Sequence, residues 1–123
     1  MKDDRLYLVH MIETARRIAQ KISGIQRSHF DADENLQLAL THLIQTVGEA
    51  ARLVEDQTRA TLPNVQWTAI TGMRHRLVHD YTRADMDVVR LVATQKNPEL
   101  ILLLSPTVDP IIAQAKASQE KAK

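Results

Sequence analysis

The 123-residue chain contains no cysteine, three glycines, four prolines, one tryptophan, two tyrosines and one phenylalanine. The lack of cysteine excludes a disulfide, a thiolate zinc site, an iron–sulfur cluster and a cysteine nucleophile. The glycines, Gly24, Gly48 and Gly72, lie far apart, so no glycine-rich phosphate loop can form, and Rossmann and P-loop proteins are disfavoured. Repeated tight β-hairpins are disfavoured by the same scarcity. The aromatic residues are too few for the stacking platform of a single-strand-binding protein.

Neither sign of charge is in excess. Sixteen Lys and Arg against fifteen Asp and Glu give a net charge of +1, so the chain is no polycation that coats nucleic acid indiscriminately. Any contact with nucleic acid must therefore be local. The charged residues 1–5 lead into no continuous apolar run, and no segment approaches the length of a bilayer span. We therefore expect a soluble, cytoplasmic protein without a membrane partner.

Aliphatic residues recur at intervals of three and four in the first half of the chain, as in amphipathic helices. The pattern predicts one helix over about residues 8–24 and a second over about residues 36–59. A polar linker over residues 26–34 separates them, with Asp31 and Asp33 as candidate N-caps. Gly48 within the second helix costs roughly 1 kcal/mol relative to alanine, which favours a close approach of another helix at that point.

In the second half, a helix is predicted over about residues 65–79, and another begins near Met86 with Asp85 as its cap. Prolines mark the expected breaks and restarts beyond it: Asn97-Pro98, Ser105-Pro106 and Asp109-Pro110. No segment of useful length has the period of a strand. We therefore predict an all-α fold with a single domain over residues 1–123. The domain is an antiparallel bundle of about four to six helices, with a polar, frayed end from about residue 116.

The residues that bear on function gather in residues 72–81, here called the motif segment. On an ideal helix an apolar stripe lies within about 60° of Arg74, formed by Trp67, Ile70, Leu77, Val78 and Tyr81. Since an unpaired buried charge is very costly, Arg74 must be paired or must line a pocket. His75, Arg76 and His79 project on the other side and form a compact cationic face, which suits a phosphate.

Three interpretations of these residues stay open on spacing alone. Arg74 could be a structural residue paired with a carboxylate such as Glu49, with solvated histidines beside it. His75 and His79, four residues apart, could bind a metal, but the glutamate of the zinc-protease motif and a third ligand are missing. The third interpretation is acid–base chemistry on a phosphodiester, in which a histidine moves protons and an arginine binds phosphate oxygens.

The pattern Arg74, four residues, His79, one residue, Tyr81 resembles the signature of HEPN-domain proteins of the HepT-like (DUF86) type. The similarity covers roughly residues 4–104. Further segments follow the order of the family: Tyr7-Leu8, Met11, Phe30-Asp31, Val47-Gly48-Glu49-Ala50-Ala51, Pro63, Trp67, Asp87-Val88-Val89 and Pro98-Glu99-Leu100.

This resemblance implies a metal-independent endoribonuclease that acts as the toxin of a toxin–antitoxin pair and cleaves RNA, either tRNA or mRNA. The motif helices of a homodimer would face one another and build a composite site. Arg74 would position the scissile phosphate, and His79 would transfer protons as the 2′-hydroxyl of the RNA attacks. His75, Arg76 and Glu49 are the expected supporting residues, and neither a metal nor a cofactor is expected.

The resemblance also implies a partner, a small MNT-type nucleotidyltransferase antitoxin that transfers AMP from ATP to Tyr81. ATP would be used by that partner and not by this chain. An adenylate on Tyr81 would bring bulk and negative charge into a phosphate site. The alternative is a non-catalytic HEPN nucleotide-binding or scaffold subunit that partners a nucleotidyltransferase.

The geometry of an ideal helix agrees with the expected role of Tyr81 but separates Arg74 from His79. Arg74 and Tyr81 are seven residues apart and share a face of an ideal helix, so a modified Tyr81 could block the arginine. Arg74 and His79, however, are about 140° apart on the same helix. They converge on one phosphate if the helix unwinds, if the arginine reaches around, or if the partner subunit completes the site. We favour the last, with some unwinding before Thr82.

Overall fold

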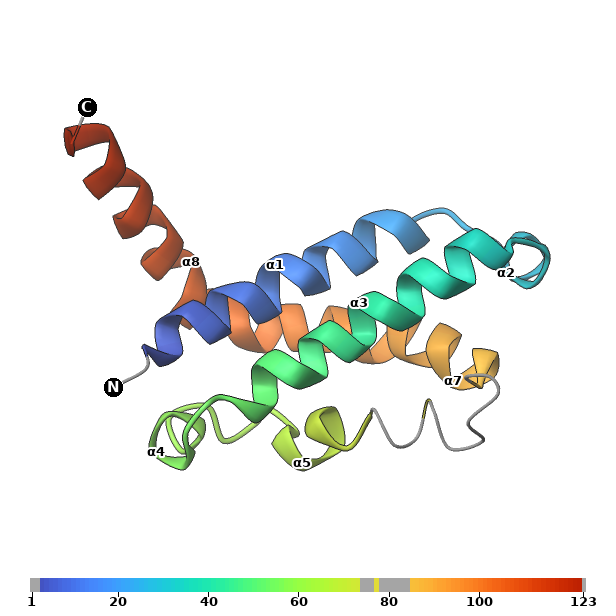
Figure 1. Cartoon of the computed structure of the whole chain (residues 1–123), viewed down its shortest axis with the longest axis horizontal. Coiled ribbons are helices and arrows are strands. Elements are labelled where there is room, and N and C mark those ends of the chain that lie inside the picture. Colours follow the sequence, from blue (N-terminus) through green and yellow to red (C-terminus); the bar gives the residue numbers. More distant parts are fainter. Residues whose placement is uncertain (1–2, 74–76, 78–84, 123) are drawn as a thin grey trace.

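A computed structural model describes residues 3–73, 77 and 85–122, and every regular element in these ranges is helical, which confirms the predicted all-α fold. The elements are α1 (Asp4–Ile22), α2 (Arg27–Ala32), α3 (Glu34–Arg52), α4 (Asp56–Arg59), α5 (Trp67–Thr71), α7 (Met86–Leu91), the π-helix η1 (Val92–Lys96) and α8 (Asn97–Ala122). Figure 1 shows α1 antiparallel both to α3 and to the long run formed by α7, η1 and α8. α4 and α5 lie together at one edge of this bundle.

The core forms where α1 packs against α3 and α8. The apolar stripe predicted for α1 is buried: Leu8, Met11, Ile12, Ala15, Ile18 and Ile22. The stripe predicted for the second helix is buried from Leu40 onward: Leu40, Leu43, Val47, Ala50 and Val54. Two polar residues of the described ranges, Thr14 and Asn97, are also buried, and the amide Nδ2 of Asn97 donates a hydrogen bond to the carbonyl oxygen of Ala15 over 2.8 Å. This bond fixes the start of α8 against α1.

Residues 26–34, predicted to be a polar linker, contain the short helix α2, so that prediction is wrong in part. Phe30, the one aromatic residue of this stretch, is buried in the core and holds α2 against the bundle. Asp33 then caps α3 as predicted, because its carboxylate accepts the N–H of Leu36 over 3.0 Å. This bond, followed by the bond to His29, lowers the pKa of Asp33 below its ordinary value.

The second long helix ends at Arg52, well before the predicted end near residue 59. The reason is a contact from the other end of the chain. The carboxylate of Asp4 accepts the backbone N–H of Glu55 over 3.1 Å and the hydroxyl of Thr58 over 2.6 Å. These bonds fix the chain after α3 and start a separate turn, α4, which the local pattern of residues could not reveal.

The predicted break at Ser105-Pro106 and the predicted new helix at Pro110 are both wrong, because α8 includes both prolines and stays helical to Ala122. A proline removes one N–H from the helix and bends it without ending it when packing holds both sides. Leu104 and Val108 supply that packing, since both are fully buried in the core. Beyond the prolines α8 turns away from the bundle, and its polar end is exposed (Figure 1).

In the part of the chain that the structure describes, one helical run, Met86–Lys121, is long and apolar enough to cross a membrane by length and composition. The prediction that no segment approaches this length is therefore wrong, since it divided the run at Pro106. The same run supplies Val89, Ala93 and Leu104 to the core. Core helices pass the same test, so the predicted absence of a membrane partner stays a prediction.

Candidate functional site

The predicted catalytic, supporting and modified residues of the motif segment lie outside the described residues: Arg74, His75, Arg76, His79 and Tyr81. Of the predicted site residues, Glu49 is described. The structure describes Met73 and Leu77 within the motif segment. It also describes the helix before the segment, α5, and the helix after it, α7. These elements show how the fold holds the two ends of the motif segment.

The approach to the motif segment is anchored by the tryptophan that begins α5. Trp67 is buried, and its indole N–H donates to the carbonyl oxygen of Leu62 over 3.1 Å. The guanidinium carbon of Arg59 lies 5.4 Å from the centre of the indole ring. The same guanidinium donates to the carbonyl oxygen of Ala51 over 3.0 Å. α5 is therefore tied to the end of α3 through the cation–π contact and the hydrogen bond of Arg59, and to the preceding segment through the bond to Leu62.

α3 and α5 approach each other closely at Gly48, as the sequence predicted. A Cβ atom on this residue would lie 3.1 Å from the carbonyl oxygen of Ile70, closer than ordinary packing allows. Glu49 follows directly, and its carboxylate accepts a hydrogen bond from Arg52 over 3.2 Å while its side chain is 44% exposed. The side chain of Glu49 lines a surface pocket between α1 and α3. The pairing of Glu49 with Arg74, one of the sequence hypotheses, lies outside the described residues.

Among the described residues of the motif segment, Met73 and Leu77 are buried. Leu77 is fully buried, which confirms its place on the predicted apolar stripe, and Met73 is 9% exposed. The two are four residues apart, the spacing of neighbours on one helix face. Sequence reasoning did not include Met73 in the stripe, although an apolar residue four positions before Leu77 was the signal that could have found it.

The chain leaves the motif segment at a second anchored point. Asp85 caps α7 as predicted, because its carboxylate accepts the N–H groups of Asp87 and Val88 over 3.0 and 3.3 Å. Asp87 in turn pairs with Arg27 of α2, which also pairs with Asp31 over 3.4 Å. The hydrogen bond to Asp87, followed by the bond to Asp31, raises the pKa of Arg27 above its ordinary value. Both ends of the motif segment are thus joined to the body of the protein.

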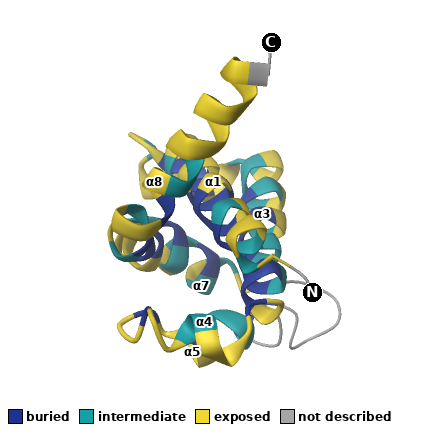
Figure 2. Ribbon diagram, turned by 90° about the vertical axis from the view of Figure 1, so that its left-hand side faces the viewer, coloured by how far each residue is buried: buried dark blue, intermediate teal, exposed yellow. Residues whose placement is uncertain are grey.

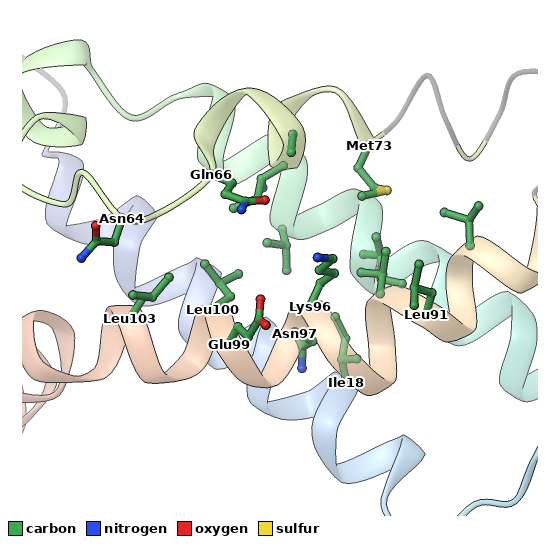
Figure 3. Close-up of a pocket in the computed structure, with 16 residues that line it drawn as sticks. Ile18, Asn64, Gln66, Met73, Leu91, Lys96, Asn97, Glu99, Leu100 and Leu103 are labelled. Carbon is green, nitrogen blue, oxygen red and sulfur yellow. The ribbon is translucent and has the colours of Figure 1, made fainter.

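A cavity of about 290 Å³ separates α5 from the run α7–η1–α8. Figure 3 shows Met73 on one side of the cavity and Leu100 and Leu103 on the other. Gln66, Lys96 and Glu99 place polar atoms in the same space. The cavity is therefore an apolar space with a few polar groups, bounded by the elements that precede and follow the motif segment.

The metal hypothesis is not tested by the described residues. Within residues 3–73, 77 and 85–122 no three His, Asp or Glu side chains gather to form a metal site. The pair that the hypothesis uses, His75 and His79, lies outside these ranges.

The fold and the motif segment together define a class, an all-helical bundle with an Arg-x4-His-x-Tyr segment between two anchored helices. The family described as Ribonuclease HepT-like matches residues 11–106, which is most of the chain. The chain therefore belongs to the HepT-like ribonuclease family, and the resemblance found in its sequence is confirmed.

Relatives from bacteria and archaea agree with this assignment. A protein of Caldanaerobacter subterraneus subsp. tengcongensis named "Putative RNase" is 28% identical over 100 residues, which cover 81% of this chain and 89% of the relative. A "Putative RNase" of Methanocaldococcus jannaschii is 23% identical over 80% of this chain and 91% of its own. The "Probable ribonuclease HepT" of Thermococcus cleftensis is 24% identical over 76% and 86%, respectively. No solved structure gives a significant match.

Proposed function

We propose that the chain is a metal-independent endoribonuclease that acts as the toxin of a HEPN/MNT toxin–antitoxin system in the cytoplasm. The observation that carries the proposal is the HepT-like family match over residues 11–106, within which Arg74, His79 and Tyr81 keep the spacing of the family signature. The names of the relatives support the coarser statement, a ribonuclease.

In the proposed reaction, Arg74 binds the oxygens of the scissile phosphate and stabilises the charge that develops there. The 2′-hydroxyl of the RNA attacks the phosphorus while His79 transfers protons. The bond from phosphorus to the 5′-oxygen breaks, and the products are a 2′,3′-cyclic phosphate and a 5′-hydroxyl end. His75, Arg76 and Glu49 support this arrangement. Since Arg74 and His79 diverge by about 140° on one ideal helix, the partner subunit of a homodimer completes the site.

The decisive experiment replaces the proposed proton-transfer residue. His79→Ala should lower the rate of RNA cleavage by at least about a hundredfold, the range of general acid–base catalysis. The far-UV circular dichroism and the sedimentation coefficient should stay those of the wild-type dimer. His29→Ala, which removes an exposed histidine of α2, is the matched control. Cleavage that survives His79→Ala would contradict the assignment.

Metal independence is tested by EDTA, which should leave the cleavage rate unchanged. An activity that EDTA abolishes and zinc restores would favour the metal site at His75 and His79.

The antitoxin part of the proposal has its own test. Incubation with the MNT-type nucleotidyltransferase and ATP should add the mass of AMP to Tyr81 and stop cleavage, and Tyr81→Phe should prevent the addition. Modification found only at other residues would refute the placement. A protein that never cleaves RNA, yet forms a stable complex with the nucleotidyltransferase, would support the scaffold alternative.

A further inference from the structure

The cavity between α5 and the run α7–η1–α8 has the size and position of a recognition pocket for one base. Its volume of about 290 Å³ lies at the lower end of the roughly 300–1,000 Å³ of small-molecule sites. A single planar base suits this volume better than a whole nucleotide with its phosphates. α5 ends just before the motif segment and α7 begins just after it, so whatever fills the cavity contacts both flanks of that segment.

Two charged side chains of opposite sign point into this space. Figure 3 shows the ammonium of Lys96 and the carboxylate of Glu99 directed from η1 and α8 toward α5, where Gln66 lies. Within the part of the chain that the structure describes, neither Lys96 nor Glu99 forms a salt bridge. A donor and an acceptor therefore stand side by side at the cavity, each able to bind a ligand.

The helix that carries them is unusual at this point. η1 is a π-helix over Val92–Lys96, and the N–H of Asn97 reaches back to the carbonyl oxygen of Val92. A π-turn places one extra residue within the turn and occurs frequently at functional sites. Here Val92 and Lys96, the first and last residues of the π-helix, both line the cavity, as does Glu99 one turn later. The irregular turn thus coincides with the polar part of the pocket.

We propose that this cavity binds a guanine base of the RNA substrate, and the inference rests on the ribonuclease function proposed above. A lysine donor matches the O6 acceptor of guanine. Beside O6, guanine presents two adjacent donors, N1–H and N2–H, which a carboxylate can accept together. No other RNA base places two donors and a carbonyl on this edge. RNA bases that are splayed out of a single strand are read along this edge.

The surrounding side chains fit the rest of the base. Ile70 and Met73 on the α5 side and Leu100 and Leu103 on the α8 side provide apolar surface for the faces of a planar ring. The amide of Gln66 adds a further donor and acceptor. The pocket would therefore select the nucleotide that lies next to the motif segment, and Lys96 and Glu99 act as specificity-determining residues.

The test compares four short RNA oligonucleotides that differ at one position, which holds guanine, adenine, cytosine or uracil. The wild-type chain should cleave the guanine oligonucleotide about tenfold faster than the others. Glu99→Gln and Lys96→Met should each remove this preference, a change of about 1.4 kcal/mol. Glu120→Gln and Lys116→Met make the same changes on the exposed end of α8 and should keep the preference. Thermal unfolding of all four variants should match the wild type, because each of these side chains is exposed.

The outcomes separate this inference from the proposed function. Equal cleavage of the four oligonucleotides would overturn the guanine pocket and leave the ribonuclease intact. If no RNA is cleaved, the proposed function fails, and a titration with guanosine 5′-monophosphate followed by NMR decides the pocket. Shifts at Lys96 and Glu99 that adenosine 5′-monophosphate does not cause, and that Glu99→Gln removes, would support guanine binding. Binding of the free mononucleotide without a guanine preference in RNA cleavage would overturn the assignment to the RNA substrate.

Discussion

α1 and α3 meet along their length through buried side chains, whereas α5 approaches α3 closely at Gly48 and borders a cavity that α3 also lines. Figure 2 shows buried residues along α1 and α3, whereas the region of α4 and α5 is mostly coloured as intermediate or exposed. The two regions also differ in how they are held. Apolar packing joins α1 to α3, while the approach to α5 combines buried apolar side chains with the polar contacts of Trp67 and Arg59.

Because of this difference, we expect the two regions to have different roles in stability and in function. Elements with dense apolar contacts open at the full cost of unfolding, and elements with few such contacts move at a lower cost. The α1–α3–α8 bundle therefore carries the stability of the protein. α4 and α5, here called the α5 layer, lead into the motif segment. This layer can shift when a ligand binds in the cavity. Changes in the bundle should affect unfolding, and changes in the α5 layer should affect RNA cleavage.

The largest effect is expected in the bundle. Leu40→Ala removes a fully buried side chain from the centre of α3 and should lower the free energy of unfolding by about 2–5 kcal/mol. Chemical denaturation measures this change. The control is Leu38→Ala on the same helix, where the side chain is 58% exposed and the change should stay within about 0.5 kcal/mol. Equal effects of the two variants would contradict the division into regions.

A smaller loss of stability is expected at the anchor of α5. Trp67→Phe keeps a buried ring but removes the indole N–H that binds the carbonyl oxygen of Leu62. Loss of one such bond costs about 1 kcal/mol, and the unpaired carbonyl adds to that cost. RNA cleavage by the folded protein should fall as well, because α5 positions the start of the motif segment. Unchanged cleavage at a temperature where the variant is fully folded would show that α5 does not control the site.

Gly48→Ala tests whether the α5 layer can move. The new Cβ would lie 3.1 Å from the carbonyl oxygen of Ile70, so α5 must shift by a few tenths of an ångström. Alanine favours the helix by up to about 1 kcal/mol, which offsets part of the crowding. We expect the free energy of unfolding to change by less than about 1 kcal/mol while the cleavage rate falls. A loss of several kcal/mol would mean that α5 is held as firmly as α1.

The smallest expected effect is on the loss of stability at acid pH. The N–H of Leu36 and the side chain of His29 lower the pKa of Asp33 in the folded protein. The stabilisation is therefore present above the pKa that Asp33 has in the unfolded chain. It is lost as the pH falls through the lower pKa that Asp33 has in the folded protein. Asp33→Asn keeps an N-cap without the charge and should flatten the decrease of melting temperature below about pH 4. An unchanged acid slope in that variant would exclude this contribution.

Local patterns in the sequence predicted much of this fold. The buried stripes of α1 and α3, the caps at Asp33 and Asp85 and the close contact at Gly48 each depend on residues within a few positions of one another, or on a single residue type. The motif segment was found in the same way, from the spacing of Arg74, His79 and Tyr81, and the family match agrees with that assignment. The roles of these three residues stay predictions.

Other features depended on residues far apart in the chain. α3 ends at Arg52 because Asp4 binds Glu55 and Thr58, about fifty positions away. α8 passes through Pro106 and Pro110 because buried neighbours hold it on the core. Neither effect leaves a trace in a local window of sequence, so the predicted end near residue 59 and the break at Ser105-Pro106 were wrong.

The sequence by itself determined that this protein is a helical bundle of the HepT-like ribonuclease family, because helical period, helix caps and a motif with fixed spacing are local properties of the chain. The tertiary structure alone decided where the helices end and which faces stay apart. It also decided that Lys96 and Glu99 share a cavity with Gln66. The physical reason is that packing and long-range hydrogen bonds join residues that no local pattern relates.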